Sequence, residues 1–566
     1  MTLPVTLQAA FAATLVDEWA RAGVTDVVVA PGSRSTPLAL AVDAAPLRVH
    51  VYLDERSAAF FALGLALASG RPAPVIVTSG TAAAELHPAI VEAHHAHVPL
   101  VVCTADRPVE LHDVGAPQTI EQRHLYGTVL RWQLDLGAVA DLPPSAWRSV
   151  AARSIGAATG GVLGPGPVQL NLGFRDPLVA SPGDLVPPGR ADGRPWHVVD
   201  AGPSLAPPSL APPSLAVPSL APPSLAPYAG RRGVVVAGAG APADTAAAAA
   251  ALGWPVLAAP ASGCRGAPGA VAAFDAILRH PATASRLRPD VVVRVGGAPA
   301  SKVLAAWAAG APEQVVHDPY AIWADPDRSA TVFLRGGLAS LGACSPAPRE
   351  WLTEWERAEE AAQTAITGYL GDGGDATEPG VARLLTTVLG SEGTLFVASS
   401  MPVRDVEWYG SPDMACRVLA NRGANGIDGL VSTALGVAAG SGRPVLALLG
   451  DLAFLQDSGG LVRAPERGAD CCFVVVDNNG GGIFSFLPQA ELPREQFERL
   501  WGTPHGTDLA ALAAAHGVPV VTVTDMGELR EALPGSGVRV VVVRTDRAAN
   551  VRVHEELHAA VAAALA

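Results

Sequence analysis

The chain has 566 residues, of which 49% are apolar and 16% are charged, and its formal net charge is −14. This is a globular composition, and the length is sufficient for two to four domains with their own cores. The negative charge argues against nucleic acid as a partner. It also means that local clusters of arginine or lysine must hold any anionic substrate.

Cysteine spacing and the apolar segments indicate a cytoplasmic protein with no membrane span. The six cysteines form no CxxC pair or metal-ligand spacing, which is typical of reduced core residues; they are Cys103, Cys264, Cys344, Cys416, Cys471 and Cys472. The first 23 residues lack a basic leader and predict an amphipathic helix, not a signal peptide. Residues 245–264 are uncharged, but Gly253 and Pro255 interrupt them, so a helix followed by a strand explains them better than a membrane span.

Apolar strand candidates alternate with helical segments over the first 180 residues, which predicts a parallel sheet covered by helices. The candidates are Asp26–Ala30, Val49–Leu53, Val75–Thr78, Leu100–Thr104 and Val168–Leu172. Between Pro203 and Pro227 the sequence then repeats PSLAP. Frequent prolines exclude helix and sheet, so we expect an extended interdomain tether here; a ligand for a proline-recognition domain is the less favoured alternative.

Residues 231–345 restart the alternation and predict a second, Rossmann-like domain. The segment Gly238-Ala239-Gly240 resembles half of a dinucleotide fingerprint but lacks the third glycine, so an NAD-binding protein remains a weak alternative. A charged helix, 350–362, leads to a third α/β unit. The predicted division is 1–185 for the first domain, 186–229 for the linker, 230–350 for the middle domain and 351–566 for the last.

Two polar strand ends in the last unit predict a metal and diphosphate site. Asp451 follows the apolar strand candidate 445–449, and Asn478 follows the candidate 472–476. They are 27 positions apart, the length of one strand–helix–strand crossover, so neighbouring parallel strands place them at the same sheet edge. Mg²⁺ prefers such oxygen ligands together with phosphates. The glycines 480–482 would let backbone groups approach a diphosphate closely.

Taken alone, the Asp451 segment is typical of a strand end, and the segment with Asn478 and the glycines is typical of a glycine-rich turn. Together they resemble the two-part signature of thiamine-diphosphate (ThDP) enzymes, GD-x followed by NN, although Leu452 stands where many of them have glycine. Such an enzyme needs a glutamate beside the aminopyrimidine of its cofactor, and Glu55, where a strand gives way to a helix, is the candidate. Alone, Glu55 would be an ordinary acidic residue of a first helical turn. It precedes a Thr78-Ser79-Gly80 turn that could cap a helix beside the pyrimidine.

Six motifs make the resemblance specific: APGSRSTPLAL (30–40), DERSAAFFALGLA (54–66), TSGTAAAEL (78–86), TADRPVEL (104–111), NRGANGIDGLVSTALGVA (421–438) and DNNGGGIFSFLPQ (477–489). Together they resemble the MenD family, the 2-succinyl-5-enolpyruvyl-6-hydroxy-3-cyclohexene-1-carboxylate synthases of menaquinone biosynthesis. The resemblance spans everything except the PSLAP tether. It implies three parallel-sheet α/β domains of the pyruvate-oxidase-like type, with active sites between the subunits of a homodimer or homotetramer.

The resemblance also implies roles for individual residues. Those implied in catalysis are Glu55, Ser400, Arg404 and Arg422. The implied cofactor contacts are Glu55, Thr78, Ser79, Gly80, Ile427, Gly450, Asp451, Asn478, Gly480, Gly481, Ile483 and Phe484. The implied ligands of Mg²⁺, or of Mn²⁺, are Asp451, Asn478 and the carbonyl of Gly480. The implied substrate contacts are Ser33, Arg34, Arg107, Gln118, Lys302, Ser400, Arg404, Arg422, Ile483, Phe484 and Leu487.

The implied reaction is decarboxylation of 2-oxoglutarate followed by 1,4-addition of the resulting enamine to isochorismate. Both substrates carry two carboxylates, and the implied substrate contacts include four arginines and the only lysine of the chain, Lys302. One departure from some relatives is Pro117 in place of an asparagine before Gln118. The nearest alternative is another ThDP carboligase or decarboxylase that acts on pyruvate or an acyl-CoA.

Overall fold

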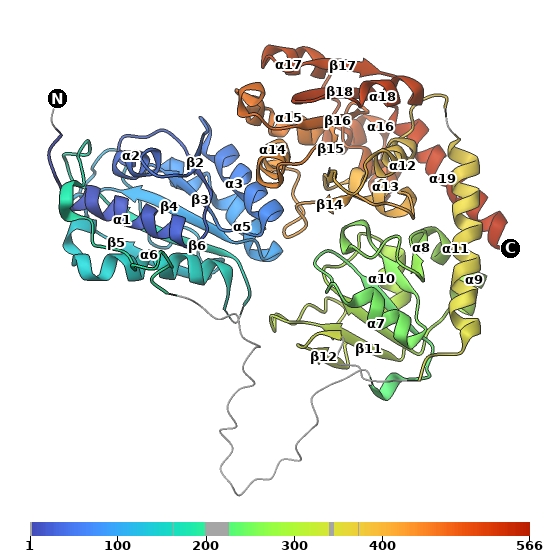
Figure 1. Cartoon of the computed structure of the whole chain (residues 1–566). Helices are drawn as coiled ribbons and strands as arrows, with labels where there is room; N and C mark the ends of the chain where they lie inside the picture. Colours follow the sequence, from blue (N-terminus) through green and yellow to red (C-terminus); the bar gives the residue numbers. More distant parts are fainter. Residues whose placement is uncertain (1–2, 162, 198–225, 339–344, 372) are drawn as a thin grey trace, which may run out of the picture.

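The structure is a computed structural model that describes residues 3–161, 163–197, 226–338, 345–371 and 373–566. In these ranges the chain forms three six-stranded sheets, each in its own region of the molecule (Figure 1). Neighbouring strands pair in parallel in all three sheets, as the βαβ alternation predicts. The predicted fold class of three parallel-sheet α/β domains is therefore confirmed. Most of the PSLAP repeat and Cys344 lie outside the described residues.

The first sheet has the strand order β2-β1-β3-β4-β6-β5. Its strands are β1 (Asp26–Val29), β2 (Arg48–Val51), β3 (Ala73–Val77), β4 (Leu100–Asp106), β5 (Trp132–Leu136) and β6 (Pro167–Gly173). Its helices are α1 (Leu7–Arg21), α2 (Thr36–Asp43), α3 (Glu55–Ser69), α4 (Thr81–Ala84), α5 (His87–Ala96) and α6 (Pro144–Thr159). The sequence pattern missed β5, an edge strand in which polar residues alternate with apolar ones and every side chain is half-buried.

The middle sheet has the order β12-β11-β10-β7-β8-β9, which is the Rossmann order 3-2-1-4-5-6 read from the other edge. Its strands are β7 (Gly233–Ala237), β8 (Val256–Ala258), β9 (Ala270–Val271), β10 (Val291–Val295), β11 (Glu313–His317) and β12 (Val332–Leu334). Its helices are α7 (Thr245–Leu252), α8 (Phe274–Arg279), α9 (Pro281–Arg286) and α10 (Lys302–Ala309). A Cβ on Gly238 would lie 1.6 Å from the carbonyl oxygen of Gly297, so close backbone packing explains that glycine.

The third sheet, with the order β14-β13-β15-β16-β18-β17, repeats the relative order of the first. Its strands are β13 (Thr394–Val397), β14 (Arg417–Leu419), β15 (Val445–Gly450), β16 (Cys471–Asp477), β17 (Val520–Val523) and β18 (Val538–Arg544). The helices of this part of the chain are α11 (Arg349–Leu370), α12 (Glu378–Val388), α13 (Met401–Tyr409), α14 (Leu430–Ser441), α15 (Asp451–Gln456), α16 (Arg494–Phe497), α17 (Leu509–Ala515), α18 (Met526–Ala532) and α19 (Arg547–Leu565). The charged helix that we expected at 350–362 is the first part of the longer α11.

Helices α3 and α14 join the first and third domains (Figure 1). Phe60, Phe61 and Leu63 of α3 belong to the same buried cluster as Leu430 and Leu435 of α14. This cluster continues into both sheets, so the two domains share one core across the helix pair. Their relative position is therefore set by apolar packing.

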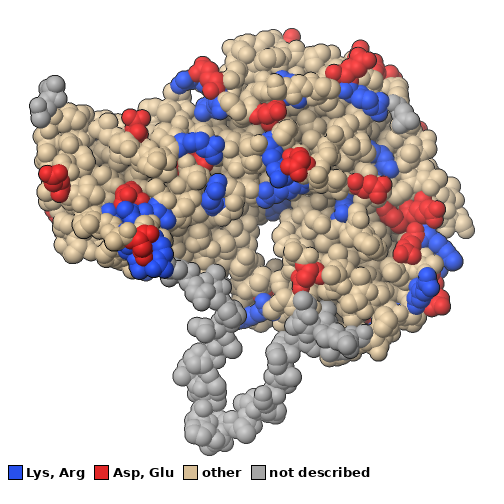
Figure 2. All heavy atoms as spheres, viewed as in Figure 1, with Lys and Arg blue, Asp and Glu red and all other residues tan. Residues whose placement is uncertain are grey.

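The surface in view carries small groups of acidic and basic side chains separated by broad uncharged areas (Figure 2). Among the described residues, no helix has both the length and the apolarity needed to cross a bilayer. The five cysteines of the described ranges are free and buried, as the sequence predicts.

Candidate active site

Asp451 and Asn478 lie side by side at the carboxyl edge of the third sheet. Strands β15 and β16 are parallel neighbours in which Gly450 is paired with Val476, so the residues that follow them emerge together. Asp451 is buried, and its carboxylate accepts hydrogen bonds from the N–H groups of Gly480 (2.8 Å) and Leu452 (2.6 Å). Burial raises the pKa of Asp451, and these N–H groups oppose that shift by stabilising the charged form.

Asn478 presents a buried oxygen that has no partner. Its Nδ2 donates to Oε1 of Glu378 (2.8 Å), while its Oδ1 is buried and accepts no hydrogen bond from any described residue. A buried acceptor without a donor is costly, and a cation removes that cost. The oxygen chemistry of Asn478 and Asp451 therefore fits a divalent cation such as Mg²⁺.

The glycines that follow Asn478 are required by close backbone contacts. Gly480 has φ +139°, and a Cβ there would lie 1.9 Å from the carbonyl oxygen of Gly502. A Cβ on Gly481 would lie 2.3 Å from the carbonyl oxygen of Trp501. No side chain fits between these two segments, which leaves backbone groups to line the turn beside Asp451, as a diphosphate site requires.

His505 is a residue of this centre that sequence reasoning missed. Its Nε2 lies 3.3 Å from Oδ2 of Asp451 and 3.7 Å from Oδ1 of Asp477, and the three groups are close enough to hold a metal ion together. The side chain of Asn479 holds the loop in place by accepting hydrogen bonds from the N–H groups of His505 and Gly506, both at 3.0 Å. No local pattern marks His505, because it lies in a loop far along the chain from either strand end.

A cavity of about 340 Å³ opens over this centre, and every residue that lines it comes from the last domain. It brings together eleven of the predicted site residues: Ser400, Arg404, Arg422, Ile427, Gly450, Asp451, Asn478, Gly480, Gly481, Ile483 and Phe484. Glu378, which the sequence did not single out, also lines it. Burial raises the pKa of Glu378, and the charge of Asp405 raises it further.

Two arginines give one side of this cavity a positive charge. Arg404 donates from Nη1 to the carbonyl oxygen of Ser400 (2.5 Å), and Arg422 donates no hydrogen bond to any described residue. Burial lowers the pKa of both, and their mutual repulsion lowers that of Arg422 further. Ser400 has φ +75°, a strained backbone conformation for a non-glycine residue. Two partly buried guanidinium groups with free donors make a site for a carboxylate.

A second group of predicted residues gathers in the first domain around Ser79. The Ser79 hydroxyl donates to the carbonyl oxygen of Gln118 and accepts from Nη1 of Arg107, both at 2.9 Å. The Gln118 side chain donates to the carbonyl oxygen of Ser79 (2.9 Å), and the N–H of Gly80 donates to Gln122 (2.9 Å). This cluster therefore has its own hydrogen-bond network, in which Gln122 was not predicted.

Three further predicted residues adjoin this cluster. Arg34 donates from Nη1 to the carbonyl oxygen of Phe174 (2.8 Å), and burial and the charge of Arg107 lower its pKa. Ser33 directly precedes Arg34. Thr78 is buried, and a Cβ on Gly32 would lie 2.3 Å from its Cβ. The strand ends of the first sheet thus collect a cationic group of residues like that of the third sheet.

Glu55 opens α3 and does not line the cavity of the last domain. It is half-buried, and burial raises its pKa, with the nearby charges of Asp54 and Glu85 in the same direction. The next residue, Arg56, donates from Nη2 to the carbonyl oxygen of Gln456 (2.8 Å). Within one chain, the residues predicted for one active centre therefore do not all lie around one cavity.

Lys302 and Leu487 also lie outside the residues that line the cavity. Lys302 is exposed at the start of α10, where the N–H groups of Ala300 (2.8 Å) and Ser301 (2.7 Å) donate to the carboxylate of Glu407. Glu407 belongs to α13, the helix of Arg404, so this contact fixes the start of α10 against that helix. Leu487 is half-buried directly after the 3₁₀ segment Gly482–Phe486.

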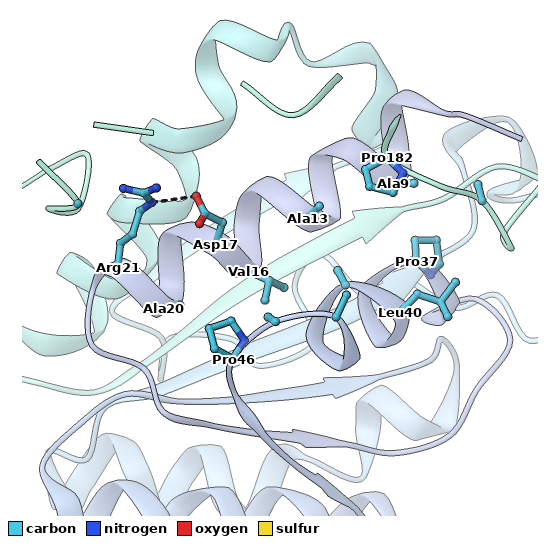
Figure 3. A pocket seen from close by; sticks show the side chains of 15 residues that line it. Ala9, Ala13, Val16, Asp17, Ala20, Arg21, Pro37, Leu40, Pro46 and Pro182 are labelled. Atoms are coloured by element: carbon cyan, nitrogen blue, oxygen red, sulfur yellow. Dashed lines mark hydrogen bonds and ion pairs between the residues drawn. The ribbon is translucent and has the colours of Figure 1, made fainter. Parts of the chain in front are cut away.

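A larger cavity, of about 560 Å³, lies elsewhere, on the first domain between α1 and α2 (Figure 3). Alanine and proline side chains make up most of its lining, with the Asp17–Arg21 ion pair (2.9 Å) at one end. It contains none of the predicted site residues. Size alone does not identify the chemical centre of this chain.

Comparison with known proteins places all three sheets in one superfamily. Three family profiles match: the thiamine pyrophosphate enzyme N-terminal TPP binding domain over residues 9–125, the middle domain of thiamine pyrophosphate enzymes over 218–397, and the C-terminal TPP binding domain over 417–543. The similar curated proteins are named 2-succinyl-5-enolpyruvyl-6-hydroxy-3-cyclohexene-1-carboxylate synthase. That of Chloroflexus aurantiacus is 43% identical over 98% of this chain and 96% of its own length. That of Thermobifida fusca is 43% identical over 98% of this chain and 99% of its own length. That of Listeria monocytogenes is 37% identical over 98% of this chain and 98% of its own length.

Proposed function

We propose a specific reaction for this chain, which belongs to the family of 2-succinyl-5-enolpyruvyl-6-hydroxy-3-cyclohexene-1-carboxylate synthases and is a thiamine-diphosphate enzyme. In the proposed reaction, 2-oxoglutarate loses CO₂ and the remaining succinyl semialdehyde unit forms a carbon–carbon bond with isochorismate in a 1,4-addition. The product belongs to menaquinone biosynthesis, and the enzyme class is transferase. The observation that best supports this reaction is the composition of the cavity. The unpartnered Oδ1 of Asn478 and two arginines with unused hydrogen-bond donors line the same cavity.

The cation and cofactor are assigned to the glycine-rich side of this cavity. Asp451, Oδ1 of Asn478 and the carbonyl of Gly480 would hold Mg²⁺, or Mn²⁺, because all three offer oxygen ligands. Gly450, Gly481, Ile483 and Phe484 would contact the diphosphate and thiazolium parts of the cofactor, and Ile427 would contact it with an apolar side chain. When bound, thiamine diphosphate supplies the nucleophile and the electron sink that removal of CO₂ from a 2-oxo acid requires.

The protein's own contribution is to hold a proton and to orient two dianions. Glu55 would hold a proton at its carboxyl group facing the aminopyrimidine, a role favoured by its raised pKa. Thr78, Ser79 and Gly80 would contact the cofactor from the turn that they form. Ser400, Arg404 and Arg422 would orient the substrate carboxylates inside the cavity. The other substrate contacts in this proposal are Ser33, Arg34, Arg107, Gln118, Lys302 and Leu487.

The complete active site would form between two chains. The Glu55 and Ser79 groups do not line the cavity of their own chain, which supports a site that receives them from a second copy. We therefore expect a homodimer, or a homotetramer built from such dimers. The free, buried cysteines of the described ranges agree with the cytoplasmic location that forms part of the proposal.

The decisive experiment follows the ultraviolet absorbance of isochorismate in the presence of purified protein, ThDP, Mg²⁺ and 2-oxoglutarate. We expect loss of the diene signal only when all components are present, with the product mass confirmed by mass spectrometry. Omission of each component in turn is the control. If isochorismate persists while CO₂ is released from 2-oxoglutarate, the acceptor is wrong. Turnover of pyruvate or an acyl-CoA in place of 2-oxoglutarate would favour a different ThDP enzyme.

A further inference from the structure

A buried carboxylate of the first domain reaches across to a loop of the active-site cavity in the same chain. Glu92, on α5, accepts a hydrogen bond from the N–H of Gly423 at Oε1 (2.7 Å) and from the N–H of Ala424 at Oε2 (2.6 Å). Its side chain is almost completely buried, with 3% of the residue exposed. The loop also packs tightly on α5, because a Cβ on Gly423 would lie 2.6 Å from the carbonyl oxygen of Glu92.

The loop held by Glu92 carries three of the residues that line the cavity, Arg422, Asn425 and Ile427. Arg422 directly precedes the two bonded N–H groups, and Ile427 follows a few residues later. Since Arg422 makes no side-chain hydrogen bond to a described residue, the position of its backbone is what limits where its guanidinium group can reach. Asn421 anchors the start of the loop, because its Nδ2 donates a hydrogen bond to the hydroxyl of Thr433 (3.1 Å). Without Glu92, the segment between Asn421 and Ile427 would lose its main polar anchor.

Packing alone does not explain why a carboxylate, that of Glu92, is buried at this position. Desolvation raises the pKa of Glu92, while the N–H groups of Ala424, Gly423 and Asn425 lower it. An apolar side chain of similar size would pack here without that desolvation cost. It could not, however, accept two hydrogen bonds from consecutive N–H groups, which fix both the position and the direction of a loop.

We propose that Glu92 is a positioning residue that holds the 421–427 loop, and with it Arg422 and Ile427, in the geometry the reaction needs. The inference rests on the proposed function for the roles of Arg422 and Ile427. The Glu92 contact would also connect the first domain, which carries the Glu55 and Ser79 groups, to the cavity in the last domain of the same chain. Glu92 lies in the middle of α5, the helix that follows the Ser79–Gly80 turn with only the short α4 between them. The first domain thus supports the cavity of its own chain as well as carrying the Glu55 group.

The test compares Glu92→Gln with Glu18→Gln, a control in the same domain. Glu18 is also a buried carboxylate, but it accepts from Nη1 of Arg148 (2.7 Å) and does not line the cavity. The first readout is hydrogen exchange of the loop backbone. We expect the amides of Gly423 and Ala424 to exchange at least about tenfold faster in Glu92→Gln than in wild type, and to be unchanged in Glu18→Gln. Unchanged exchange in Glu92→Gln would overturn the proposal.

The second readout is steady-state kinetics with 2-oxoglutarate and isochorismate. We expect kcat/KM to fall about tenfold or more in Glu92→Gln, and the double variant Glu92→Gln, Arg422→Ala to be no slower than Arg422→Ala alone. Equal losses of kcat/KM in Glu92→Gln and Glu18→Gln would contradict the proposal, because they would show that Glu92 affects only the stability of the fold. If wild type does not catalyse the reaction, the proposed function fails, and the exchange experiment still decides whether Glu92 holds the loop. If Glu92→Gln does not fold, Glu92→Asp, which keeps the charge but withdraws it by one methylene, is measured in the same way.

Discussion

Burial raises the pKa of the two acidic residues to which the proposed mechanism gives different tasks. Asp451 and Glu55 have ordinary side chains, but desolvation raises the pKa of both, and each is then tuned by different neighbours. Asp451 receives two backbone N–H groups that favour its charged form, as a metal ligand needs. Glu55 has the negative charges of Asp54 and Glu85 nearby, which favour its protonated form. The same functional group, a carboxyl, therefore suits two different tasks.

Replacement of Glu55 with glutamine should abolish turnover while leaving cofactor binding largely intact. The amide cannot exchange a proton with the aminopyrimidine, and loss of such acid–base assistance costs about 10²- to 10⁴-fold in kcat. The measurement is kcat in the isochorismate assay, with ThDP and Mg²⁺ affinity followed by tryptophan fluorescence. The control is Glu356→Gln, an exposed glutamate of α11 that does not line the cavity, which should stay close to wild type. Wild-type turnover in Glu55→Gln would remove Glu55 from the mechanism.

Asp457 should make the stability of the protein depend on pH. Its buried carboxylate accepts from the N–H of Ser432 (2.7 Å) and from the hydroxyl of Ser57, and burial raises its pKa from 3.8 to about 6. The folded protein therefore binds this proton more tightly than the unfolded chain, and the stabilising contribution is lost as the pH rises from about 4 through 6. The shift corresponds to up to about 3 kcal/mol. Urea unfolding of Asp457→Asn should lack this part of the pH dependence; a slope identical to that of wild type would contradict the assignment.

The contact between α3 and α14 determines how the first and third domains lie together. Gly64 and Gly436 allow the two helices to approach so closely that backbone meets backbone. A Cβ on Gly64 would lie 2.1 Å from the carbonyl oxygen of Thr433, and one on Gly436 would lie 2.2 Å from that of Phe61. Small residues are needed on both sides, because the shared core leaves no room for the helices to separate.

Gly64→Ala should destabilise the protein although alanine favours helix. The added methyl group overlaps a backbone oxygen, and such overpacking costs about 1–3 kcal/mol. The matched control is Gly368→Ala in α11, where a Cβ would meet no atom within 4 Å. That change should stabilise by about 0.5–1 kcal/mol through helix propensity alone. Thermal unfolding of the two variants measures the difference, and shifts in the same direction would show that the crossing is not close-packed.

At the scale of the whole molecule, two strand-end groups lie on one chain, one in the first domain and one in the last. The cavity of the last domain is lined without any residue of the first, while the first domain supports the same chain through α3, α5 and the shared core. A pair of chains can exchange these groups so that each cavity receives the Glu55 group of its neighbour. A monomer would then have the parts of the active site but no complete one.

Two inactive variants should therefore restore activity when mixed. Glu55→Gln damages the group of the first domain and Asp451→Asn damages that of the last, so neither homodimer has an intact site. After subunit exchange, about half of the dimers are heterodimers, and one of their two sites is unaltered, which gives about a quarter of wild-type activity. The measurement is isochorismate consumption against time after mixing. No recovery, with exchange verified by native mass spectrometry of differently tagged chains, would show that each chain forms its own site.

The sequence by itself determined the fold class, and it predicted that polar residues gather at the strand ends of the third sheet. Asp451, Asn478 and the glycines after them could be predicted because a parallel sheet brings the carboxyl ends of neighbouring strands together, so a local pattern implies a spatial one. The edge strand β5 was missed because its polar and apolar residues alternate without a buried run. Arg404 and Arg422 were implied by resemblance, and the structure brings them to one cavity.

Only the tertiary structure decided which other residues complete the centre and which groups of one chain meet. Glu378 lies 100 positions from Asn478, and His505 lies 54 positions from Asp451, so no local periodicity connects them. Their contacts depend on how helices and loops pack over the sheet edge. The close packing of α3 on α14 likewise joins residues that lie far apart in the sequence. Such long-range packing is a property of the folded chain and leaves no short-range pattern from which to predict it.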